Sequence, residues 1–364
     1  MREIFESTIE RLLADTVTPE LLRSSETGLW PAALWAALED SGFAVAAAPE
    51  NLGGAGASWA DLFVVVRAAG KHNLPVPLAE TLLANWLLGR CGLEAINAPL
   101  GLAASPVLTL LNGRVSGTLA EVPWGRDVQQ VLAITAGLKP QAVLLNTGDA
   151  QIELSMNTAG EPRDTLRFEA AVPAATAALP AGLNADALLY GAAMLRSAQI
   201  AGALHAALED TTRYATERVQ FGKAIGSFQA IQHQIAVLAE HTIAANMAAE
   251  AAFAESDLSE AAGLGLASLQ IAVAKVSSAE AASLAAGIAH GVHGAIGFTH
   301  EYALNHATRR LWSWRSEYGN ATVWSQRIGR AVCQSGAAAL WPALTAGVMH
   351  LESVATHATE GDLA

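Results

Sequence analysis

The most informative segment of the chain runs from residue 214 to residue 229 and reads YATERVQFGKAIGSFQ. Gly222 and Gly226 allow a tight turn, so the pattern predicts that one long helix ends at about Arg218 and that another, capped by Ser227, follows. Backbone N–H groups at a helix N-terminus attract an anion such as a pyrophosphate. Arg218 would add a fixed positive charge beside it. A plain helix–loop–helix with a surface arginine explains the composition equally well.

Long helical segments surround this stretch on both sides. Apolar residues recur at helical spacing over residues 184–218, 227–256, 258–288, 300–318 and 320–357. Several of these segments exceed the usual length of a globular helix, which indicates helices packed side by side. We therefore predict that the C-terminal half is a four-helix bundle, and that this bundle also builds an oligomer.

The N-terminal part is predicted to be helical as well, because Phe5, Ile9 and Leu12 recur at helical spacing and Ser58 is placed to cap a helix. The sequence pattern changes near residue 101, where short aliphatic runs alternate with Gly, Asn, Asp and Pro, as in strands joined by turns. These runs are 106–111, 128–135, 141–146, 151–156 and 165–172. The predicted fold is therefore mostly α, with a small β domain inserted between two helical domains. The predicted domain limits are 1–100, 101–183 and 184–364.

The composition excludes several classes of protein. The 364 residues carry 21 basic and 34 acidic side chains, a formal charge of −13, which argues against binding nucleic acid or an anionic membrane surface. No run reaches the roughly 18 apolar residues that span a bilayer, so we expect a cytoplasmic protein without membrane insertion. Cys91 and Cys333 are far apart in the sequence, which predicts two buried thiols and neither a disulfide framework nor a metal site.

The segment from Arg218 to Gln229 resembles the FAD-binding stretch of acyl-CoA dehydrogenases. Residue types and spacing agree over the pattern Arg-x-x-Phe-Gly-Lys-x-Ile-x-x-Phe-Gln. In that family the Arg and the Gln contact the FAD that is bound mainly by a neighbouring subunit. The resemblance therefore implies a dimer or tetramer, homomeric or heteromeric. It implies cofactor contacts from Arg218, Gln220, Phe221, Gly222 and Gln229.

A second segment, residues 290–299, reads HGVHGAIGFT and resembles a glycine-rich turn of the same family. In the family this turn reaches the adenosine and pyrophosphate side of the flavin, so the resemblance implies that Gly294 and Gly297 bind the cofactor. The family usually has a Gln at the position of Gly291, so one contact is expected to be missing. We interpret His290 and His293 as packing residues, because no carboxylate or cysteine lies at ligand spacing.

The resemblance implies α,β-dehydrogenation of an acyl-CoA thioester, in which a carboxylate removes the α-proton and the flavin accepts a hydride. Such a base needs poor solvation, which raises its pKa. In many members the base is a Glu followed by Gly; that position here is Tyr318, and the carboxylate is Glu317, one residue earlier. Other members place the base near Ala192 and Ala193, where the nearest carboxylate is Asp186.

Three hypotheses follow for the reaction. Glu317 acts as the catalytic base after a local shift of the chain. Alternatively, the protein is a non-catalytic partner that completes the FAD site of a second acyl-CoA dehydrogenase-like chain. The third hypothesis is another flavin reaction on this fold, such as that of a nitroalkane oxidase. In each case we expect Trp312 or Trp314 to line the pocket.

Overall fold

The structure is a computed structural model that describes residues 1–104, 106–137, 139–347, 349 and 351. The chain begins with five α-helices, and their core is made by apolar faces that the sequence marks by helical spacing. They are α1 (Arg2–Thr16), α2 (Pro19–Glu26), α3 (Ala32–Asp40), α4 (Trp59–Lys71) and α5 (Leu78–Arg90). Ser58 caps α4 as predicted, because its side chain accepts a hydrogen bond from the backbone N–H of Asp61.

The middle of the chain forms two four-stranded sheets. One has the strand order β1-β4-β5-β8, and the other has the order β2-β3-β7-β6. The first sheet contains β1 (Leu100–Leu102), β4 (Gln130–Ile134), β5 (Gln141–Asn146) and β8 (Ala175–Ala178). The second contains β2 (Val107–Leu111), β3 (Arg114–Pro123), β6 (Ala150–Glu153) and β7 (Arg163–Ala171). All neighbouring strands are antiparallel except β1 and β4, which are parallel.

The first sheet is buried on both faces, which explains its sequence. Residues 131–134 of β4 and 142–145 of β5 are continuous apolar runs, and all of them are buried. One face packs on the second sheet, where Val131 and Val143 meet Leu166, and the other packs on the helices through Leu132 and Leu144. The sheet pair is therefore fixed to the helical core rather than attached by a linker.

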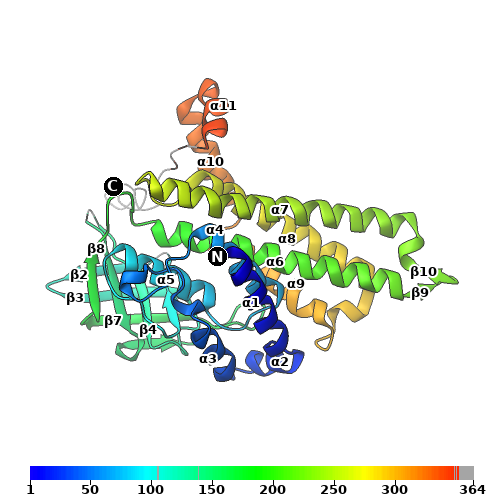
Figure 1. The fold of residues 1–364 in the computed structure, drawn as a ribbon, viewed down its shortest axis with the longest axis horizontal. Coiled ribbons are helices and arrows are strands. Elements are labelled where there is room, and N and C mark those ends of the chain that lie inside the picture. Colours follow the sequence, from blue (N-terminus) through cyan, green and yellow to red (C-terminus); the bar gives the residue numbers. More distant parts are fainter. Residues whose placement is uncertain (105, 138, 348, 350, 352–364) are drawn as a thin grey trace, which may run out of the picture.

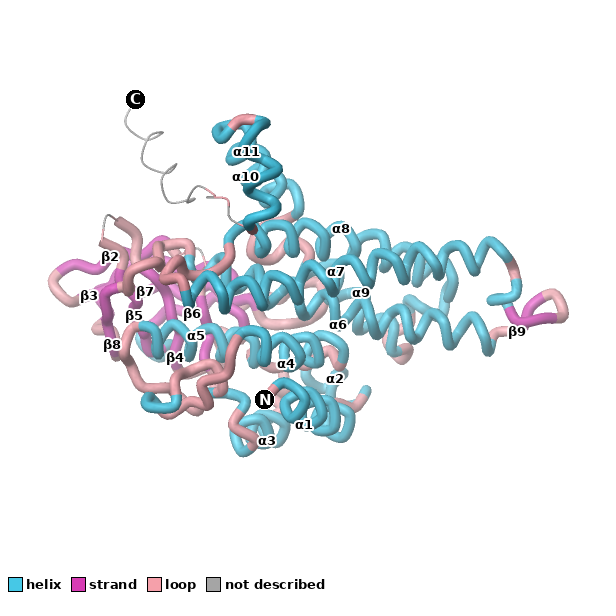
Figure 2. The backbone as a smooth tube through the Cα atoms, turned by 45° about the horizontal axis from the view of Figure 1, so that its top comes forward, coloured by secondary structure: helices cyan, strands magenta, loops and turns pink. Residues whose placement is uncertain are grey.

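The C-terminal part contains the predicted bundle of α6, α7, α8 and α9. The helices are α6 (Ala187–Glu217), α7 (Gln229–Ala261), α8 (Ser268–His293), α9 (Ala303–Trp314), α10 (Ala321–Ser335) and α11 (Ala337–Ala346). Between α6 and α7 a hairpin of β9 (Val219–Gln220) and β10 (Lys223–Ala224) replaces the predicted simple loop. The two four-stranded sheets lie at one end of the molecule, and this hairpin lies at the other end of the bundle, as Figures 1 and 2 show.

Several predicted details are wrong. Ser227 does not cap α7, because its hydroxyl donates to the carbonyl of Ala224 and Phe228 is the N-cap residue. The segment predicted over 320–357 is broken at Gly336, which has φ +79°, and its residues 352–357 lie outside the described part. Cys333 is exposed on α10, and only Cys91 is partly buried.

Helix α8 is long and apolar, and it packs inside the bundle. The segment Ser268–Phe298 is the one stretch of the described residues that is long and apolar enough to cross a membrane. More than half of its most apolar window is buried inside the protein, against α6, α7 and α9. Its apolar character is therefore accounted for by packing in the bundle core.

Candidate functional site

A cleft of about 490 Å³ lies where the strands meet the C-terminal helices. Most of its lining comes from the bulge of β3, the loop after β6, and the end of α9 with the turn that follows, and single residues come from β7, α6 and the connection before β2. Its lining residues are Ala104, Ala120, Glu121, Ser155, Met156, Asn157, Thr158, Arg163, Leu189, Trp312, Ser313, Ser316, Glu317, Tyr318 and Gly319. Trp312 lies in this wall as predicted, whereas Trp314 is buried behind it.

Glu317 reaches this cleft from a turn rather than from a helix. Helix α9 ends at Trp314, so the rotation of side chains along a helix does not set the direction of Glu317. Arg163 donates to both carboxylate oxygens of Glu317, with Nε–Oε1 and Nη2–Oε2 distances of 3.1 Å each. Arg196 Nη2 lies 2.9 Å from Oε2, and Asn157 Nδ2 donates to Oε1 at 2.9 Å. The carboxylate is therefore surrounded by donors.

This environment stabilises the charged form of Glu317. Burial by itself raises the pKa of the carboxyl, but the charges of Arg163 and Arg196 outweigh burial and lower the pKa to about 2. A general base for α-proton removal works best with a pKa near the working pH. An ionised carboxylate held by two guanidinium groups is a weak base, so Glu317 as the catalytic base stays a prediction that this geometry does not favour.

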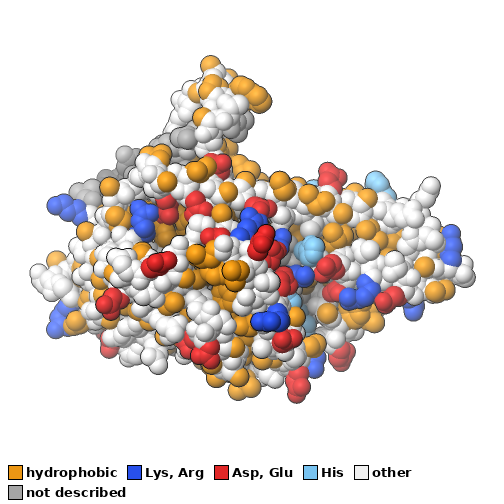
Figure 3. Space-filling view, in the orientation of Figure 1, with side chains coloured by type: hydrophobic (Ala, Val, Ile, Leu, Met, Phe, Trp, Pro, Cys, Tyr) orange, Lys and Arg blue, Asp and Glu red, His pale blue; other side chains and the backbone are white. Residues whose placement is uncertain are grey.

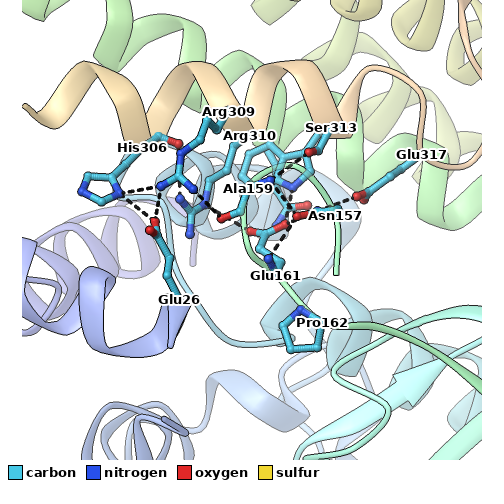
Figure 4. A network of polar contacts seen from close by, with 12 residues as sticks. Glu26, Asn157, Ala159, Glu161, Pro162, His306, Arg309, Arg310, Ser313 and Glu317 are labelled. Carbon is cyan, nitrogen blue, oxygen red and sulfur yellow. Dashed lines mark hydrogen bonds and ion pairs between the residues drawn. The ribbon is translucent and has the colours of Figure 1, made fainter. Parts of the chain in front are cut away.

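A second buried carboxylate, Glu161, continues the same network. Its Oε2 accepts hydrogen bonds from Arg163 and from the indole Nε1 of Trp314, each at 2.9 Å, and Oε1 lies 3.1 Å from Arg310 Nε. Burial raises the pKa of Glu161, but the charges of Arg310 and Arg163 outweigh it and lower the pKa overall. Figure 4 shows how the network extends along α9 to Glu26 of the N-terminal helices. Buried charges thus join all three parts of the chain.

Behind the turn that carries Glu317 lies a fully buried lysine, Lys275 of α8. Its Nζ donates to the carbonyl oxygens of Trp314 at 3.3 Å and Arg315 at 2.9 Å, at the C-terminal end of α9. Burial lowers the pKa of Lys275 to about 7, although the charge of Glu317 acts in the opposite direction. Lys275 therefore fixes the end of α9, and its amine changes charge near neutral pH.

We expect Lys275→Met to remove a pH dependence of stability. Between about pH 7 and the ordinary lysine value of 10.5 the unfolded chain binds a proton that the folded chain does not. The wild-type free energy of unfolding should therefore rise with pH over this range, by up to about 1.4 kcal/mol per pH unit relative to the variant. Urea unfolding of both proteins from pH 7 to pH 9 measures the difference, and a difference that stays constant with pH would contradict the assignment.

The two alternative positions of the base converge in space. Tyr318 and Ala192 line the same small inner void, although they are far apart in the sequence. Neither residue carries a carboxylate, and the carboxylate that lines this void is Glu80 of α5, which is paired with Arg196. Asp186 is the N-cap residue of α6, one and a half turns before Ala192, and it does not line the cleft or this void. The part of the chain that the structure describes therefore places no carboxylate of the predicted kind at either position.

The residues predicted to contact a neighbour's FAD form one exposed corner at the end of the bundle, here called the hairpin corner. Its members are Arg218, Gln220, Phe221, Gly222 and Gln229, and all five are exposed. Phe221 is 91% exposed, and Phe221 and Gly222 have φ of +51° and +80°, as a tight two-residue hairpin requires. A left-handed phenylalanine is strained, and such strain is concentrated at functional sites.

The glycine-rich turn lies at the same end of the bundle. Rings of Tyr214 on α6 and His293 on α8 stack with centroids 4.5 Å apart, which ties the two helix ends together. Gly294 has φ +65° and ψ −145°, a conformation that favours glycine, and the space beside it is open. A Cβ on Gly297 would lie 3.0 Å from His293 Cβ, so this glycine serves internal packing. Of the two glycines predicted to bind the cofactor, Gly294 is therefore the one with room for close approach of a ligand.

The hairpin corner and the cleft are well separated within one chain. Leu189 lines the cleft near the start of α6, and Arg218 follows the last residue of this helix of 31 residues. At 1.5 Å per residue the two ends are about 45 Å apart. In Figure 1 the hairpin lies at the opposite end of the bundle from the strands. One ligand molecule in this chain's own cleft therefore cannot be reached by Arg218.

The buried cations around this site could not be predicted from a motif. They are Arg163 and Arg196, which pair with Glu317, and Lys275, which binds the end of α9. One signal was present: Arg196 and Lys275 each lie within a nearly uncharged Ala-rich helical segment, where a lone cation requires a buried partner. Nothing in the sequence identified the partner of Arg196 as Glu317.

The sequence comparisons agree with this architecture. The acyl-CoA dehydrogenase N-terminal domain matches residues 2–98, and the acyl-CoA dehydrogenase C-terminal domain matches residues 184–333. The chain belongs to the acyl-CoA dehydrogenase family. Acyl-CoA dehydrogenase IpdE2 of Mycolicibacterium smegmatis is 30% identical over 308 residues, which cover 83% of this chain and 89% of that protein. The protein of the same name from Mycobacterium tuberculosis is 31% identical over 314 residues, covering 84% and 88%.

Several solved structures share the fold. The ChsE4-ChsE5 complex of Mycobacterium tuberculosis matches with a TM-score of 0.83 and 24% identity over 92% of this chain and 98% of that chain. A variant of the Tcur3481-Tcur3483 steroid ACAD matches with a TM-score of 0.80 and 26% identity over the same shares. A structure of PigA with FAD and proline matches with a TM-score of 0.79 and 18% identity, covering 92% and 98%.

Proposed function

We propose that this chain is one subunit of a two-chain, FAD-dependent acyl-CoA dehydrogenase. In this proposal its hairpin corner completes the FAD site of a neighbouring, acyl-CoA dehydrogenase-like chain, and the neighbour supplies the catalytic carboxylate. The separation of about 45 Å between Arg218 and this chain's own cleft supports a ligand in a neighbouring subunit, because it leaves the hairpin corner without a ligand in its own subunit. The ion pairs that hold Glu317 ionised support a neighbour of a different kind, which carries the base. The assembly would be a dimer or a tetramer, in the cytoplasm.

The residues of the hairpin corner fit a dinucleotide cofactor. Arg218 offers a guanidinium group for a pyrophosphate, Gln229 an amide in the first turn of α7, and Gly294 an open backbone. Phe221 offers an exposed aromatic face. When bound, FAD supplies the acceptor for the hydride that leaves the β-carbon of the acyl group. This chain's residues would bind and orient the cofactor.

In this proposal the α-proton goes to a carboxylate of the neighbouring chain. Arg163 and Arg196 hold Glu317 ionised and hydrogen bonded, and Tyr318 stands where many members carry the base. Two structural relatives support a mixed assembly, because ChsE4-ChsE5 and Tcur3481-Tcur3483 are each a pair of differently named proteins. Figure 3 shows hydrophobic side chains along the upper edge of the bundle. Ile243 and Met247 of α7 are exposed hydrophobic residues of the bundle, and they offer a surface for association.

The alternative candidate is an enzyme in which this chain acts alone with Glu317 as the base. One observation favours it: Glu317 lines the cleft at the end of a turn, where it can move without unwinding a helix. In that case substrate binding would have to separate Glu317 from both arginines, so that its pKa could rise toward the working pH.

Glu317→Gln separates the two candidates. In the assembly obtained by co-expression with a second acyl-CoA dehydrogenase-like chain of the same organism, we expect the anaerobic rate of flavin reduction by an acyl-CoA to change less than about threefold. A general base contributes on the order of a hundredfold or more, so a fall of that size would make Glu317 the base. Glu153→Gln, an exposed carboxylate on β6, is the matched control.

Purification of the wild-type chain tests directly whether this chain binds FAD without a partner. Alone, it should carry little flavin absorbance, whereas the co-expressed assembly should be yellow and should be bleached by an acyl-CoA. A yellow chain that is bleached without a partner would contradict the proposal. Oxygen consumption without any reaction on acyl-CoA would point instead to another flavin reaction.

A further inference from the structure

Tyr318 stands between two hollows of unequal size. It lines the cleft of about 490 Å³ on one side and an inner void of about 10 Å³ on the other. The void is bounded by small and apolar side chains of α5, β1 and α6, together with three polar residues. Its other lining residues are Ala79, Glu80, Leu102, Ala192, Leu195, Arg196 and Gln199. The ring of Tyr318 is therefore the wall between the cleft and an interior lined largely by aliphatic groups.

Several contacts hold Tyr318 in this position against backbone strain. Its φ of +57° is unusual for a bulky residue and costs on the order of 1 kcal/mol or more. The carbonyl of Tyr318 accepts a hydrogen bond of 2.9 Å from the indole Nε1 of Trp324. The ring lies 5.3 Å from the guanidinium carbon of Arg196, within the range of a cation–π contact. Gly319 has φ +93° and completes the turn.

Three polar atoms around the void lack a partner. They are the hydroxyl of Tyr318, Oε2 of Glu80 and Nε of Arg196, and all three are buried. Burial raises the pKa of Tyr318, so its phenol stays protonated and can donate. Buried polar groups without partners are costly, and internal waters commonly satisfy them. A void of about 10 Å³ accommodates roughly one water molecule.

We infer that Tyr318 closes the inner end of the cleft, and that one buried water molecule fixes its hydroxyl to Glu80 and Arg196. The inference goes beyond the proposed function: it concerns this chain's own cleft, whereas in the proposed function the acyl substrate reacts in the neighbouring chain's site. In this chain the aliphatic groups behind the ring, among them Leu102 and Leu195, are closed to an acyl chain. Tyr318 then limits the length of any acyl group that this cleft can bind.

Binding of acyl-CoA of two chain lengths tests the closure. Butyryl-CoA and octanoyl-CoA are titrated by calorimetry into the full wild-type chain and into Tyr318→Ala. We expect the wild type to bind the two within about threefold of each other. Tyr318→Ala should favour octanoyl-CoA by at least about tenfold, because each methylene group that it buries adds to affinity. Tyr318→Phe keeps the ring and should behave as the wild type.

Two results would overturn the closure: a wild-type preference for octanoyl-CoA of tenfold or more, or a folded Tyr318→Ala without any gain. If Tyr318→Ala does not fold, Tyr318→Leu replaces it, with a smaller gain expected. Bleaching of flavin by octanoyl-CoA in the wild-type chain alone would contradict the proposed function. Failure of the proposed function can be told apart from failure of the closure, because bleaching measures the reaction with flavin, whereas the titrations of the Tyr318 variants measure only binding.

A high-resolution crystal structure tests the water independently. The wild type should show one water within hydrogen-bonding distance of the Tyr318 hydroxyl, Glu80 Oε2 and Arg196 Nε. In Tyr318→Phe the same water should be weaker or lost, because one of its three partners is gone. An empty void in the wild type would overturn this part of the inference.

Discussion

Replacing Arg196 with Met should lower the free energy of unfolding by about 3 to 5 kcal/mol, the cost of leaving a buried ion without its partner. Arg196 is fully buried, donates to Glu80 at 3.0 Å, lies 2.9 Å from Glu317, and packs over the rings of Trp314 and Tyr318. Met fills a similar volume without charge, so two buried carboxylates would each lose a cationic partner. Denaturant unfolding of both proteins at neutral pH measures the loss.

The matched control is Arg167→Met, on strand β7. Arg167 is paired with Glu153, but both side chains are more than half exposed, so we expect a change within about 0.5 kcal/mol. A loss below about 1 kcal/mol for Arg196→Met would mean that water reaches Glu317 and Glu80, and that these carboxylates do not depend on Arg196.

Arg218→Ala should weaken flavin binding by the assembly by about tenfold to a hundredfold. A charge-assisted hydrogen bond to a phosphate contributes about 1.5 to 3 kcal/mol, and 1.4 kcal/mol is a factor of ten in the dissociation constant. Arg218 is exposed at the end of α6, so its replacement should leave the thermal unfolding of this chain almost unchanged. Titration of FAD into the apo-assembly, followed by quenching of flavin fluorescence, measures the affinity.

Arg114→Ala is the control for this second variant. Arg114 is an equally exposed arginine, but it lies on β3, at the other end of the molecule from the hairpin corner. Loss of flavin affinity in both variants would indicate a general effect of charge. Unchanged affinity in Arg218→Ala would remove the hairpin corner from the flavin site and with it the main support for the proposed function.

Much of the fold could be predicted because the deciding signals are local. The apolar run of β5 and the cap at Ser58 each depend on a few neighbouring residues, and both were predicted correctly. Strand β3 was missed, because Gly117 and two register shifts interrupt its alternation. Strand β8 was missed because Ala175–Ala178 is rich in alanine, which favours helix, and its pairing with β5 overrides that preference.

The candidate site could be predicted only in part. The hairpin corner depends on a continuous segment, so its residues could be identified from one motif and are found together in space. The surroundings of Glu317 depend on Arg163 from a strand and Arg196 from a helix, both distant in the sequence. Local patterns carry no information about such pairings, which is why the carboxylate was identified while its low pKa was not.

The buried charges between Glu26 and Glu317 have a consequence for how the molecule comes apart. They bring together side chains from the first helices, the strands and the last helices. If one of these parts unfolds alone, charged side chains of the other parts lose their partners. Unfolding should therefore be cooperative over the helices and the sheets together. A destabilising substitution in the sheets should lower the abundance of the entire subunit, including the end of the bundle that carries the hairpin corner.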